Sequence, residues 1–224
     1  METETAMKAV VFGATGETGR RIVQVLVDRQ VPVRAVVRDL ATARAILPDS
    51  VEVVQGNLLD RRSIDSALAG CTVVLSAAGA RPSLDPTGPL QVDYLGTKNL
   101  TDAAKAAGIE QLVLVSSLCV SKLLHPLNLF WLILFWKQQG ERYLQNSGLT
   151  YTIVRPGGLK NEDRDTPVVM STADTLFEGS IPRSQVAKVC IEALWEPAAR
   201  NKIVEIVARD DAPVQPWSAL FASV

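Results

Sequence analysis

Short apolar runs alternate along the chain with longer segments whose apolar residues recur at helical spacing. Runs of strand type are expected at residues 8–12, 32–37, 51–55, 72–76, 112–116 and 150–155. The helical patterns between them cover residues 17–29, 40–47, 61–69, 89–107 and roughly 127–146. Strands that alternate with helices lie side by side in a parallel sheet with helices on both faces. The pattern therefore predicts an α/β fold of the doubly wound, Rossmann-like type.

The last part of the chain continues this pattern and then changes. A further helix is expected at residues 183–195 and a late strand at 202–208. Residues 210–224 contain Pro213 and Pro216 and are expected to form a C-terminal surface tail. No linker, internal repeat or low-complexity segment divides the rest, so residues 1–209 are expected to form one domain. A chain of 224 residues is long enough for one such domain and short for two.

The first predicted strand ends in a glycine-rich turn that leads directly into a helix. Residues 9–19 read AVVFGATGETG. Glycines at this spacing permit a tight turn, a close approach of a pyrophosphate to the backbone, and close packing of helix on strand. The start of a helix also presents free N–H groups and the positive end of its dipole to an anion. The predicted dinucleotide-binding residues are Gly13, Thr15, Gly16, Glu17, Thr18 and Gly19.

The residue after the second strand indicates which dinucleotide binds. An acidic side chain at this place accepts hydrogen bonds from the ribose hydroxyls of NAD, whereas a guanidinium pairs with the 2′-phosphate of NADP. The apolar run at 31–37 is followed at once by Arg38 and then by Asp39. Because Arg38 has the better position, we predict that the cofactor is NADPH.

Composition and charge narrow the range of partners. The chain is 47% hydrophobic and has a formal net charge of −1, which gives no reason to expect disorder or a strongly charged partner. No basic stripe indicates nucleic acid binding. Cys71, Cys119 and Cys190 lie in apolar runs and His125 has no ligand neighbours, so no metal site is expected. These cysteines, with a short acidic amino terminus that has no apolar signal region, predict a cytoplasmic or plastid-stromal protein.

One apolar stretch, at residues 123–136, has two interpretations. Its sequence is LLHPLNLFWLILFW, and its uninterrupted apolar part is far shorter than the ~20 residues that cross a bilayer. We favour a buried helix. The alternative is an exposed lid, a dimer surface, or a contact with a membrane surface or a protein, for which Trp131, Phe135 and Trp136 are suited. The sequence leaves open whether the protein is a monomer or a dimer.

Five further motifs follow the glycine-rich turn in order. They are GNLLD at 56–60, SAAG at 76–79, VSS at 115–117, YTIVRPGGL at 151–159 and NKIVEI at 201–206. With this combination the chain resembles the atypical short-chain dehydrogenases/reductases, specifically their small NAD(P)H-binding branch. The resemblance extends over residues 8–207, and it implies a Rossmann-like domain into which the acceptor site is integrated.

The resemblance implies roles for residues at the strand ends. Asn57 would hydrogen-bond the adenine, and Leu58 would pack on its ring. Small residues after the fourth strand would leave room for the pyrophosphate and nicotinamide ribose, and the turn after the sixth would pass beside the nicotinamide. These further cofactor-binding residues are Ala77, Ala78, Gly79, Ser116, Pro156, Gly157 and Gly158. By contrast, Asp60, Asp93 and Asp102 are expected to cap helices or to face solvent.

The catalytic pair of the larger family is incomplete in this chain. Most such reductases pair a tyrosine with a lysine four residues later. The lysine that aligns is Lys137, but Ile133 stands at the tyrosine position and Tyr143 lies on the wrong side of the lysine. Lys137 is therefore expected only to orient the cofactor. The biliverdin-IXβ/flavin reductases, which this chain resembles in its turn and fifth strand, work without a tyrosine acid. Their active-site serine matches Ser117, the predicted catalytic residue.

The missing acid favours particular acceptors. A ketone needs a proton as the hydride arrives, whereas flavins, quinones and conjugated tetrapyrroles delocalise the charge and can take a proton from solvent. We therefore predict an NADPH-dependent reductase of such an acceptor, for example FMN, FAD or biliverdin. The alternative is a non-catalytic NADP(H) sensor or scaffold, because the chain also resembles the reductase-like part of a chloroplast inner-envelope translocon component. An epimerase is disfavoured, because it too needs the tyrosine.

Overall fold

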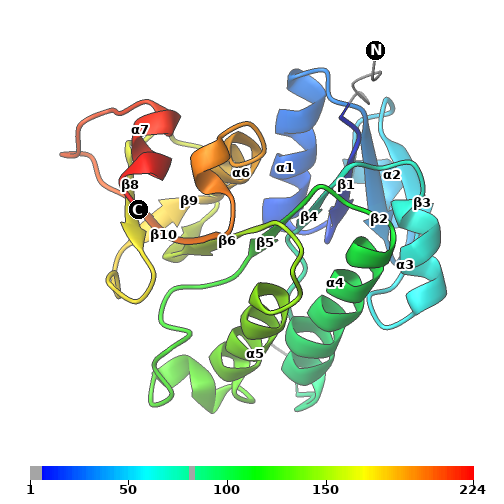
Figure 1. Ribbon diagram of the computed structural model, residues 1–224, viewed down its shortest axis with the longest axis horizontal. Coiled ribbons are helices and arrows are strands. Elements are labelled where there is room, and N and C mark those ends of the chain that lie inside the picture. Colours follow the sequence, from blue (N-terminus) through cyan, green and yellow to red (C-terminus); the bar gives the residue numbers. More distant parts are fainter. Residues whose placement is uncertain (1–6, 81–83) are drawn as a thin grey trace.

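A mainly parallel sheet forms the centre of the fold (Figure 1). The computed structural model describes residues 7–80 and 84–224. In this described chain eight strands form one sheet in the order β3-β2-β1-β4-β5-β6-β10-β8, in which β8 alone is antiparallel. These strands are β1 (Ala9–Phe12), β2 (Val33–Val37), β3 (Glu52–Gln55), β4 (Val73–Ser76), β5 (Gln111–Val115), β6 (Tyr151–Pro156), β8 (Val168–Thr172) and β10 (Lys202–Ala208). Outside this sheet, β7 (Gly158–Lys160) pairs in parallel with β9 (Ser180–Pro182).

Helices cover both faces of the sheet, as Figure 1 shows. On one face α1 (Glu17–Asp28) packs against α6 (Arg183–Glu192). On the other face α4 (Thr97–Ala106) packs between α3 (Arg61–Leu68) and α5 (Ile133–Gln145). The remaining helical segments are α2 (Leu40–Ile46), the π-helix η1 (Leu90–Gly96) that runs into α4, the 3₁₀ turns η2 (Pro126–Leu129) and η3 (Pro197–Ala199), and α7 (Trp217–Ala222).

Alternation along the strands separates two hydrophobic cores. In β1, Ala9 and Val11 belong to the core under α1 and α6, whereas Val10 and Phe12 belong to the core under α3 and α4. All four residues are buried. Because helices cover both faces of a parallel sheet, its central strands are apolar throughout. This is why continuous apolar runs indicate these strands in the sequence.

The direction of strand progression reverses between β1 and β4. From β1 the chain moves outward through β2 to β3, and then returns to β4 on the other side of β1 before continuing to β5 and β6. The carboxyl ends of β1 and β4 therefore border the crevice in which doubly wound sheets bind their ligands. The predicted α/β, Rossmann-like fold is confirmed.

The predicted elements recur with small shifts at their ends, and two helices differ. The helix predicted at 89–107 begins as the π-helix η1, and the one predicted at 127–146 is broken into η2 and α5. The break contains Trp131 and Leu132, whose φ angles of 58° and 59° are left-handed. Strands β7, β8 and β9 are not indicated by the sequence pattern. Two of them are only three residues long, too short for a periodic signal.

The C-terminal segment corrects the expectation of a surface tail at 210–224 for the part that forms α7, whereas residues 210–216 are largely exposed. Pro216 precedes α7, on which Leu220 is buried and Phe221 is 0% exposed. Both side chains join the core on the α1 and α6 face of the sheet. The proline that suggested a tail instead stands at the start of a helix, where its missing N–H removes no helical hydrogen bond.

The apolar stretch at 123–136 is largely exposed, so the favoured interpretation of a buried helix is wrong for most of it. Leu124 is 97% exposed, whereas Leu134 near the start of α5 is buried. Asn128 fixes the path of the stretch, since its amide nitrogen donates to the Leu123 carbonyl (2.9 Å) and its side-chain oxygen accepts from the Leu134 N–H (2.9 Å). No helix in the described ranges is long and apolar enough to cross a membrane.

Candidate cofactor-binding site

A cleft of about 470 Å³ opens at the carboxyl edge of the sheet. The β1–α1 turn, the ends of β2, β3 and β4, and the segment leading into η1 form its walls. The predicted residues that the structure brings together here are Gly13, Thr15, Gly16, Arg38, Asn57, Leu58, Ala77, Ala78 and Gly79. The cleft thus lies at the reversal of strand order, where the fold predicts a ligand.

Other residues that line the cleft are not among the predicted site residues. They are Phe12, Val36, Val37, Gly56, Leu59, Ala80, Asp85, Gly88, Gln91 and Val92. Most of them directly precede or follow a motif residue at a strand end, so their position in the chain is the only signal that could have found them. Asp85 and Gly88 come to the cleft through the path of the chain before η1, which leaves no local pattern, and Gln91 and Val92 come to it from the start of η1 itself.

Two glycines of the turn are required by close approaches of the backbone. Gly13 has a left-handed φ of +75°, and a Cβ atom there would lie 2.7 Å from the Ala78 nitrogen. A Cβ atom on Gly19 would lie 2.1 Å from the Gly13 carbonyl oxygen. Any side chain at either place would push the turn off β4 or α1 off the turn. The sequence therefore keeps the start of α1 tight against the strand ends.

The start of α1 has the features of an anion site. Gly16 stands at the N-cap, and within the described chain no side chain caps the helix. The first N–H groups of α1 are therefore without helical partners beside the cleft, and they carry the positive end of the helix dipole. A glycine cradle, free N–H groups and small residues at Ala77 and Ala78 together fit the pyrophosphate of a dinucleotide.

Three predicted residues of this turn do not line the cleft. The Glu17 carboxylate accepts hydrogen bonds from Arg20 (2.7 Å) and Arg21 (3.0 Å). The Thr18 hydroxyl accepts from the Arg183 guanidinium (3.1 Å) at the start of α6, and Gly19 packs on the turn. At Glu17 and Thr18, therefore, the backbone N–H is what the turn can offer a phosphate.

Arg38 and Asp39 are adjacent but differ in what they can bind. The Asp39 carboxylate accepts from the Ala41 N–H (3.0 Å) and from the Thr42 hydroxyl, so it caps α2. These two hydrogen bonds, that of Thr42 first, lower the pKa of Asp39. Arg38 is exposed, lines the cleft, and forms no ion pair with any described residue. A guanidinium is thus left at the position where the second strand meets the cofactor ribose in this fold.

Comparison with known proteins decides the family. Residues 13–197, most of the chain, match the NAD(P)H-binding family. The chain belongs to this family. It is thereby a member of the atypical short-chain dehydrogenases/reductases, and the predicted resemblance is confirmed.

Relatives of this NAD(P)H-binding protein include plant proteins. It is 44% identical over 239 residues to an uncharacterized chloroplastic protein of Arabidopsis thaliana, covering 100% of this chain and 85% of that protein. It is 37% identical over 241 residues to the chloroplastic protein TIC 62 of Pisum sativum, covering 96% of this chain but only 45% of TIC 62. Sanguinarine reductase of Eschscholzia californica is 27% identical over 268 residues, covering 100% and 98%.

Solved structures agree with the family over nearly the whole chain. A Bacillus halodurans protein, provisionally named an NAD-dependent epimerase/dehydratase, superposes with a TM-score of 0.85 at 27% identity, covering 97% of this chain and 100% of that one. The anaerobillin reductase ChuY of Escherichia coli superposes with a TM-score of 0.77 at 26% identity, covering 93% and 100%.

The two residues predicted to contact the adenine lie in the segment after β3. Asn57 accepts from the Leu59 N–H (3.0 Å) through its side-chain oxygen, so its amide nitrogen is the part that can donate to a base. The Asn57 N–H itself donates to the Ser63 hydroxyl (2.9 Å). Leu58 packs toward Gly96, and its carbonyl accepts from the Asn99 amide (3.0 Å). Both predicted adenine contacts are therefore held in place by α3 and α4.

The predicted lysine at the other end of the cleft forms an ion pair with a buried aspartate. Lys137 on α5 is 15% exposed in its side chain, and its Nζ lies 2.7 Å from Asp93 Oδ1. Asp93 is 1% exposed, so the expectation that it caps a helix or faces solvent is wrong. A Cβ atom on Gly79 would lie 3.4 Å from the Lys137 Nζ, which places the pair directly beside the cleft lining.

The two predicted serines follow β5, one strand further from the adenine end. Ser116 is buried, and its hydroxyl oxygen has no hydrogen-bond partner among residues 7–80 and 84–224. A buried hydroxyl without a partner is rare in proteins and calls for a ligand or a water. Ser117 is half-buried and therefore the more accessible of the two.

The turn after β6 has its own packing requirement. Pro156 is buried, and its carbonyl accepts from the Leu118 N–H (3.0 Å). A Cβ atom on Gly157 would lie 2.6 Å from the Gly179 carbonyl oxygen, so this glycine is needed for contact with the loop before β9. Gly158 is exposed. These three residues lie beside the serines but outside the cleft lining, and their contact with a nicotinamide stays a prediction.

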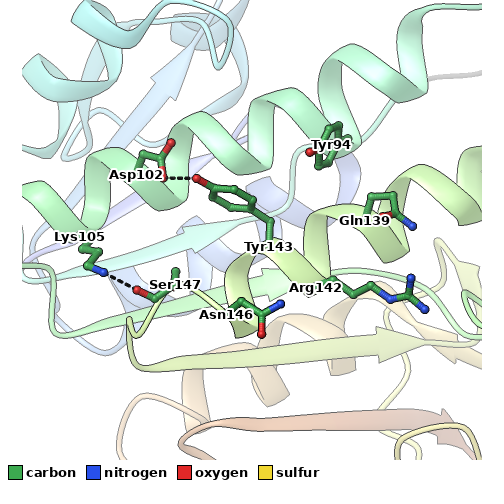
Figure 2. A pocket seen from close by; sticks show the side chains of 8 residues that line it. All are labelled: Tyr94, Asp102, Lys105, Gln139, Arg142, Tyr143, Asn146 and Ser147. Carbon is green, nitrogen blue, oxygen red and sulfur yellow. Dashed lines mark hydrogen bonds between the residues drawn. The ribbon is translucent and has the colours of Figure 1, made fainter.

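The three tyrosines of the chain lie away from the cleft. Tyr94 and Tyr143 line a separate hollow of about 430 Å³ between α4 and α5, and Figure 2 shows the Tyr143 hydroxyl pointing to Asp102, to which it donates a hydrogen bond (2.7 Å). Tyr151 begins β6 at the opposite, amino-terminal edge of the sheet. Ile133, where the family places its tyrosine, is the first residue of α5.

Potential metal ligands are scattered in the structure. The described residues contain no group of three or more His, Cys, Asp or Glu side chains that could hold a metal ion. His125 accepts a hydrogen bond from the Leu127 N–H (3.2 Å) and thus caps η2. Cys71, Cys119 and Cys190 are free and buried.

Proposed function

We propose that the protein is an NADPH-dependent reductase that transfers hydride to a flavin or to another conjugated acceptor, such as biliverdin or a quinone. The observation that carries this proposal is a dinucleotide cleft with no tyrosine among the described residues that line it. A ketone would need a proton from such a group, whereas a conjugated acceptor spreads the charge over its rings and takes its proton from solvent. Two relatives that are named as reductases, sanguinarine reductase and ChuY, support reductase chemistry.

Each part of the cleft has one task in this function. NADPH supplies the hydride when it is bound. The N–H groups at the start of α1 bind the pyrophosphate, Arg38 pairs with the 2′-phosphate, and Asn57 and Leu58 bind the adenine. Lys137 orients the nicotinamide end. The chain thereby holds the cofactor against the face of the acceptor, and proximity lowers the barrier.

Ser117 is the candidate catalytic residue in this proposal. It is half-buried at the end of β5, next to the buried Ser116. Its hydroxyl would hydrogen-bond the carboxamide of the cofactor or a heteroatom of the acceptor, while Ser116 would bind the cofactor. Neither role includes proton transfer to the acceptor, so both serines act by orientation.

The test is NADPH oxidation with a panel of acceptors. FMN, FAD, biliverdin and a quinone are offered in turn, with an aliphatic ketone as the control substrate. Turnover with at least one conjugated acceptor and little or none with the ketone supports the proposal. Robust reduction of the ketone contradicts it. The matched protein control is Gly16→Val, in which the cofactor site is blocked.

A non-catalytic NADP(H)-sensing or scaffold protein is the second candidate. The observation that favours it is the exposed apolar stretch at 123–136, which offers a contact surface for a membrane or a protein partner. NADPH binding without oxidation by any acceptor of the panel would favour this function. Co-flotation with lipid vesicles and sedimentation would then show whether the stretch binds membranes or joins two copies into a dimer.

The proposed cellular compartment rests on the cysteines and on the names of relatives. Three free, buried cysteines suit the reducing cytoplasm or plastid stroma. Two relatives carry chloroplastic names, which agrees with the stroma. Cell fractionation followed by immunodetection distinguishes the two compartments. Nothing in the proposed function requires nucleic acid.

A further inference from the structure

The ion pair of Asp93 and Lys137 calls for a functional explanation, because a contribution to the stability of the fold does not account for it. Asp93 Oδ1 accepts from the Lys137 Nζ at 2.7 Å, and Asp93 Oδ2 accepts from the Ala80 N–H at 3.3 Å. Within the described chain neither side chain has another hydrogen-bond partner or ion-pair partner. Taking two charges out of water costs about as much as their attraction returns, so such pairs are weak evidence for stabilisation.

The fold brings the pair together through a special contact. Asp93 lies in the π-helix η1, and π-helical turns are frequently found at functional sites. Gly140 on α5 faces it, and a Cβ atom there would lie 2.4 Å from the Asp93 carbonyl oxygen. Glycine inside a helix costs roughly 1 kcal/mol relative to alanine. The chain therefore accepts a weaker helix in order to bring α5, and Lys137 with it, close to Asp93.

The pair lies at the edge of the cofactor cleft. A Cβ atom on Gly79 would lie 3.4 Å from the Lys137 Nζ and 3.5 Å from Asp93 Oδ1, and both Gly79 and Ala80 line the cleft. A lysine ammonium has three N–H donors, of which Asp93 occupies one. The other two are available for hydroxyl groups of a ligand, while the carboxylate cancels the positive charge.

We propose that Asp93 is a positioning residue that fixes Lys137 and balances its charge, so that the cleft binds the oxidised cofactor about as readily as the reduced one. The nicotinamide ring is neutral in NADPH and positively charged in NADP⁺. An unpaired ammonium beside the ring would disfavour NADP⁺ by Coulomb repulsion, whereas a neutral pair would not. The inference rests on the proposed function for the identity of the cofactor as NADP(H), and not on turnover.

The test compares the dissociation constants of NADP⁺ and NADPH by titration calorimetry without any acceptor. Asp93→Asn keeps the shape of the side chain and an oxygen for Lys137, but removes the negative charge. We expect the ratio of the NADP⁺ constant to the NADPH constant to rise roughly tenfold, as repulsion between partly screened charges predicts. An equal rise of both constants, or an unchanged ratio, overturns the charge-balancing role.

Two further variants make the test specific. Lys137→Met removes the cation and leaves the carboxylate, and it is measured at about pH 8, where carboxyl groups are ordinarily ionised. The ratio of the NADP⁺ constant to the NADPH constant should then fall, because the remaining negative charge favours NADP⁺. This arm also carries the test if Asp93→Asn does not fold, and an unchanged ratio there overturns the inference. The double variant Asp93→Asn/Lys137→Met should bring the ratio back to within about threefold of the wild-type value.

The matched control is Asp102→Asn. Asp102 also pairs with a lysine, Lys98 at 2.9 Å, but in the hollow between α4 and α5. Its loss should leave the ratio unchanged, and a shift equal to that of Asp93→Asn would contradict a local effect. Because binding alone is measured, a failure here leaves the reductase test untouched. Conversely, the absence of turnover would leave the predicted binding ratios standing.

Discussion

At the scale of single residues, Arg38 should decide the preference between the two dinucleotides. The Asp39 carboxylate is occupied by the first turn of α2, which leaves the Arg38 guanidinium to meet the 2′-phosphate. Arg38→Ala should weaken NADPH binding roughly ten- to a hundredfold, about 1.5–3 kcal/mol, and leave NADH binding unchanged. Titration calorimetry measures both. Arg44→Ala, an exposed arginine on α2 that does not line the cleft, is the control and should change neither. An unchanged NADPH constant for Arg38→Ala would exclude the phosphate contact.

Gly16 should be essential for binding but not for folding. It lines the cleft with an ordinary φ of −78°, and a Cβ atom there would lie 3.2 Å from the Gly13 carbonyl oxygen, a tight but adjustable contact. In Gly16→Val the branched side chain would occupy the space of the pyrophosphate, so NADPH binding should be lost while the circular dichroism spectrum and cooperative unfolding persist. A folded variant that retains its NADPH affinity would show that the pyrophosphate lies elsewhere.

A substitution at Ile133 tests whether the reaction needs a proton that the protein donates. Where proton transfer limits a reaction, a general acid contributes about 10²–10⁴ in rate. Flavin takes hydride without such a donor, so Ile133→Tyr should change the rate of FMN reduction by no more than about threefold. Stopped-flow measurement of NADPH oxidation with saturating FMN gives the rate. A large acceleration would mean that the unmodified protein is limited by proton supply.

A residue's place at the cleft can be predicted from the sequence when it depends on residues that are close in the chain. The turn from Gly13 to Gly19 could be predicted because strand, turn and helix are contiguous, and Arg38 because it follows an apolar run at once. Asp93 could not, because its partner Lys137 lies 44 residues away and a lone aspartate in a helical pattern indicates solvent. Long-range polar pairs have no local signal, so the glycine-rich turn was predictable and the pair of Asp93 and Lys137 was not.

At the scale of elements, one buried arginine joins β6, α5 and β10. Arg155 donates to Glu141 on α5 (2.6 Å) and to Glu205 on β10 (3.2 Å). Glu205 also accepts three backbone N–H groups of the loop after β8, at residues 174–176. All three side chains are buried. This loop therefore takes its position from β10, a strand that follows it by some thirty residues in the chain.

Removing Glu205 should be strongly destabilising. Glu205→Ala leaves three backbone N–H groups and part of the Arg155 charge without partners in the interior, and losses of this kind cost about 3–5 kcal/mol. The control is Glu162→Ala, which removes an exposed pair with Lys160 and should cost less than about 1 kcal/mol. Urea unfolding of both variants measures the difference. Equal stabilities would mean that solvent replaces the lost carboxylate.

The boundaries of helices and strands, too, could be predicted from the local sequence only in part. Strands β1 to β6 and β10 were predictable, since apolar runs that alternate with helices indicate the strands of a parallel sheet. The break between η2 and α5 was not, because Asn128 holds it through hydrogen bonds to Leu123 and Leu134 on either side. Within the apolar run that follows, the sequence pattern alone is compatible with one continuous helix.

At the scale of the whole molecule, the expectation from the sequence pattern and the observed burial disagree in two segments. The apolar stretch at 123–136 exposes Leu124, while α7, from a segment that contains two prolines, buries Phe221 in the core under α1 and α6. This burial depends on the packing of elements that are distant in the sequence, since α7, near the end of the chain, packs against η3 and β8. Large exposed apolar patches on folded proteins often serve as contact surfaces, which is why the second candidate function assigns a partner to this stretch.

The contrast between these two segments gives a stability prediction in which one variant serves as the control for the other. Phe221→Ala should lower the free energy of unfolding by about 3–5 kcal/mol, because it leaves a cavity around which a packed core relaxes only partially. Leu124→Ala, in the more apolar segment, should change it by no more than about 0.5 kcal/mol, since that side chain is already in water. Chemical denaturation with unchanged m-values for both variants makes the comparison clean. If Leu124→Ala destabilises the isolated protein as much as Phe221→Ala, the stretch at 123–136 is covered in solution, and sedimentation would then identify a second copy as the cover.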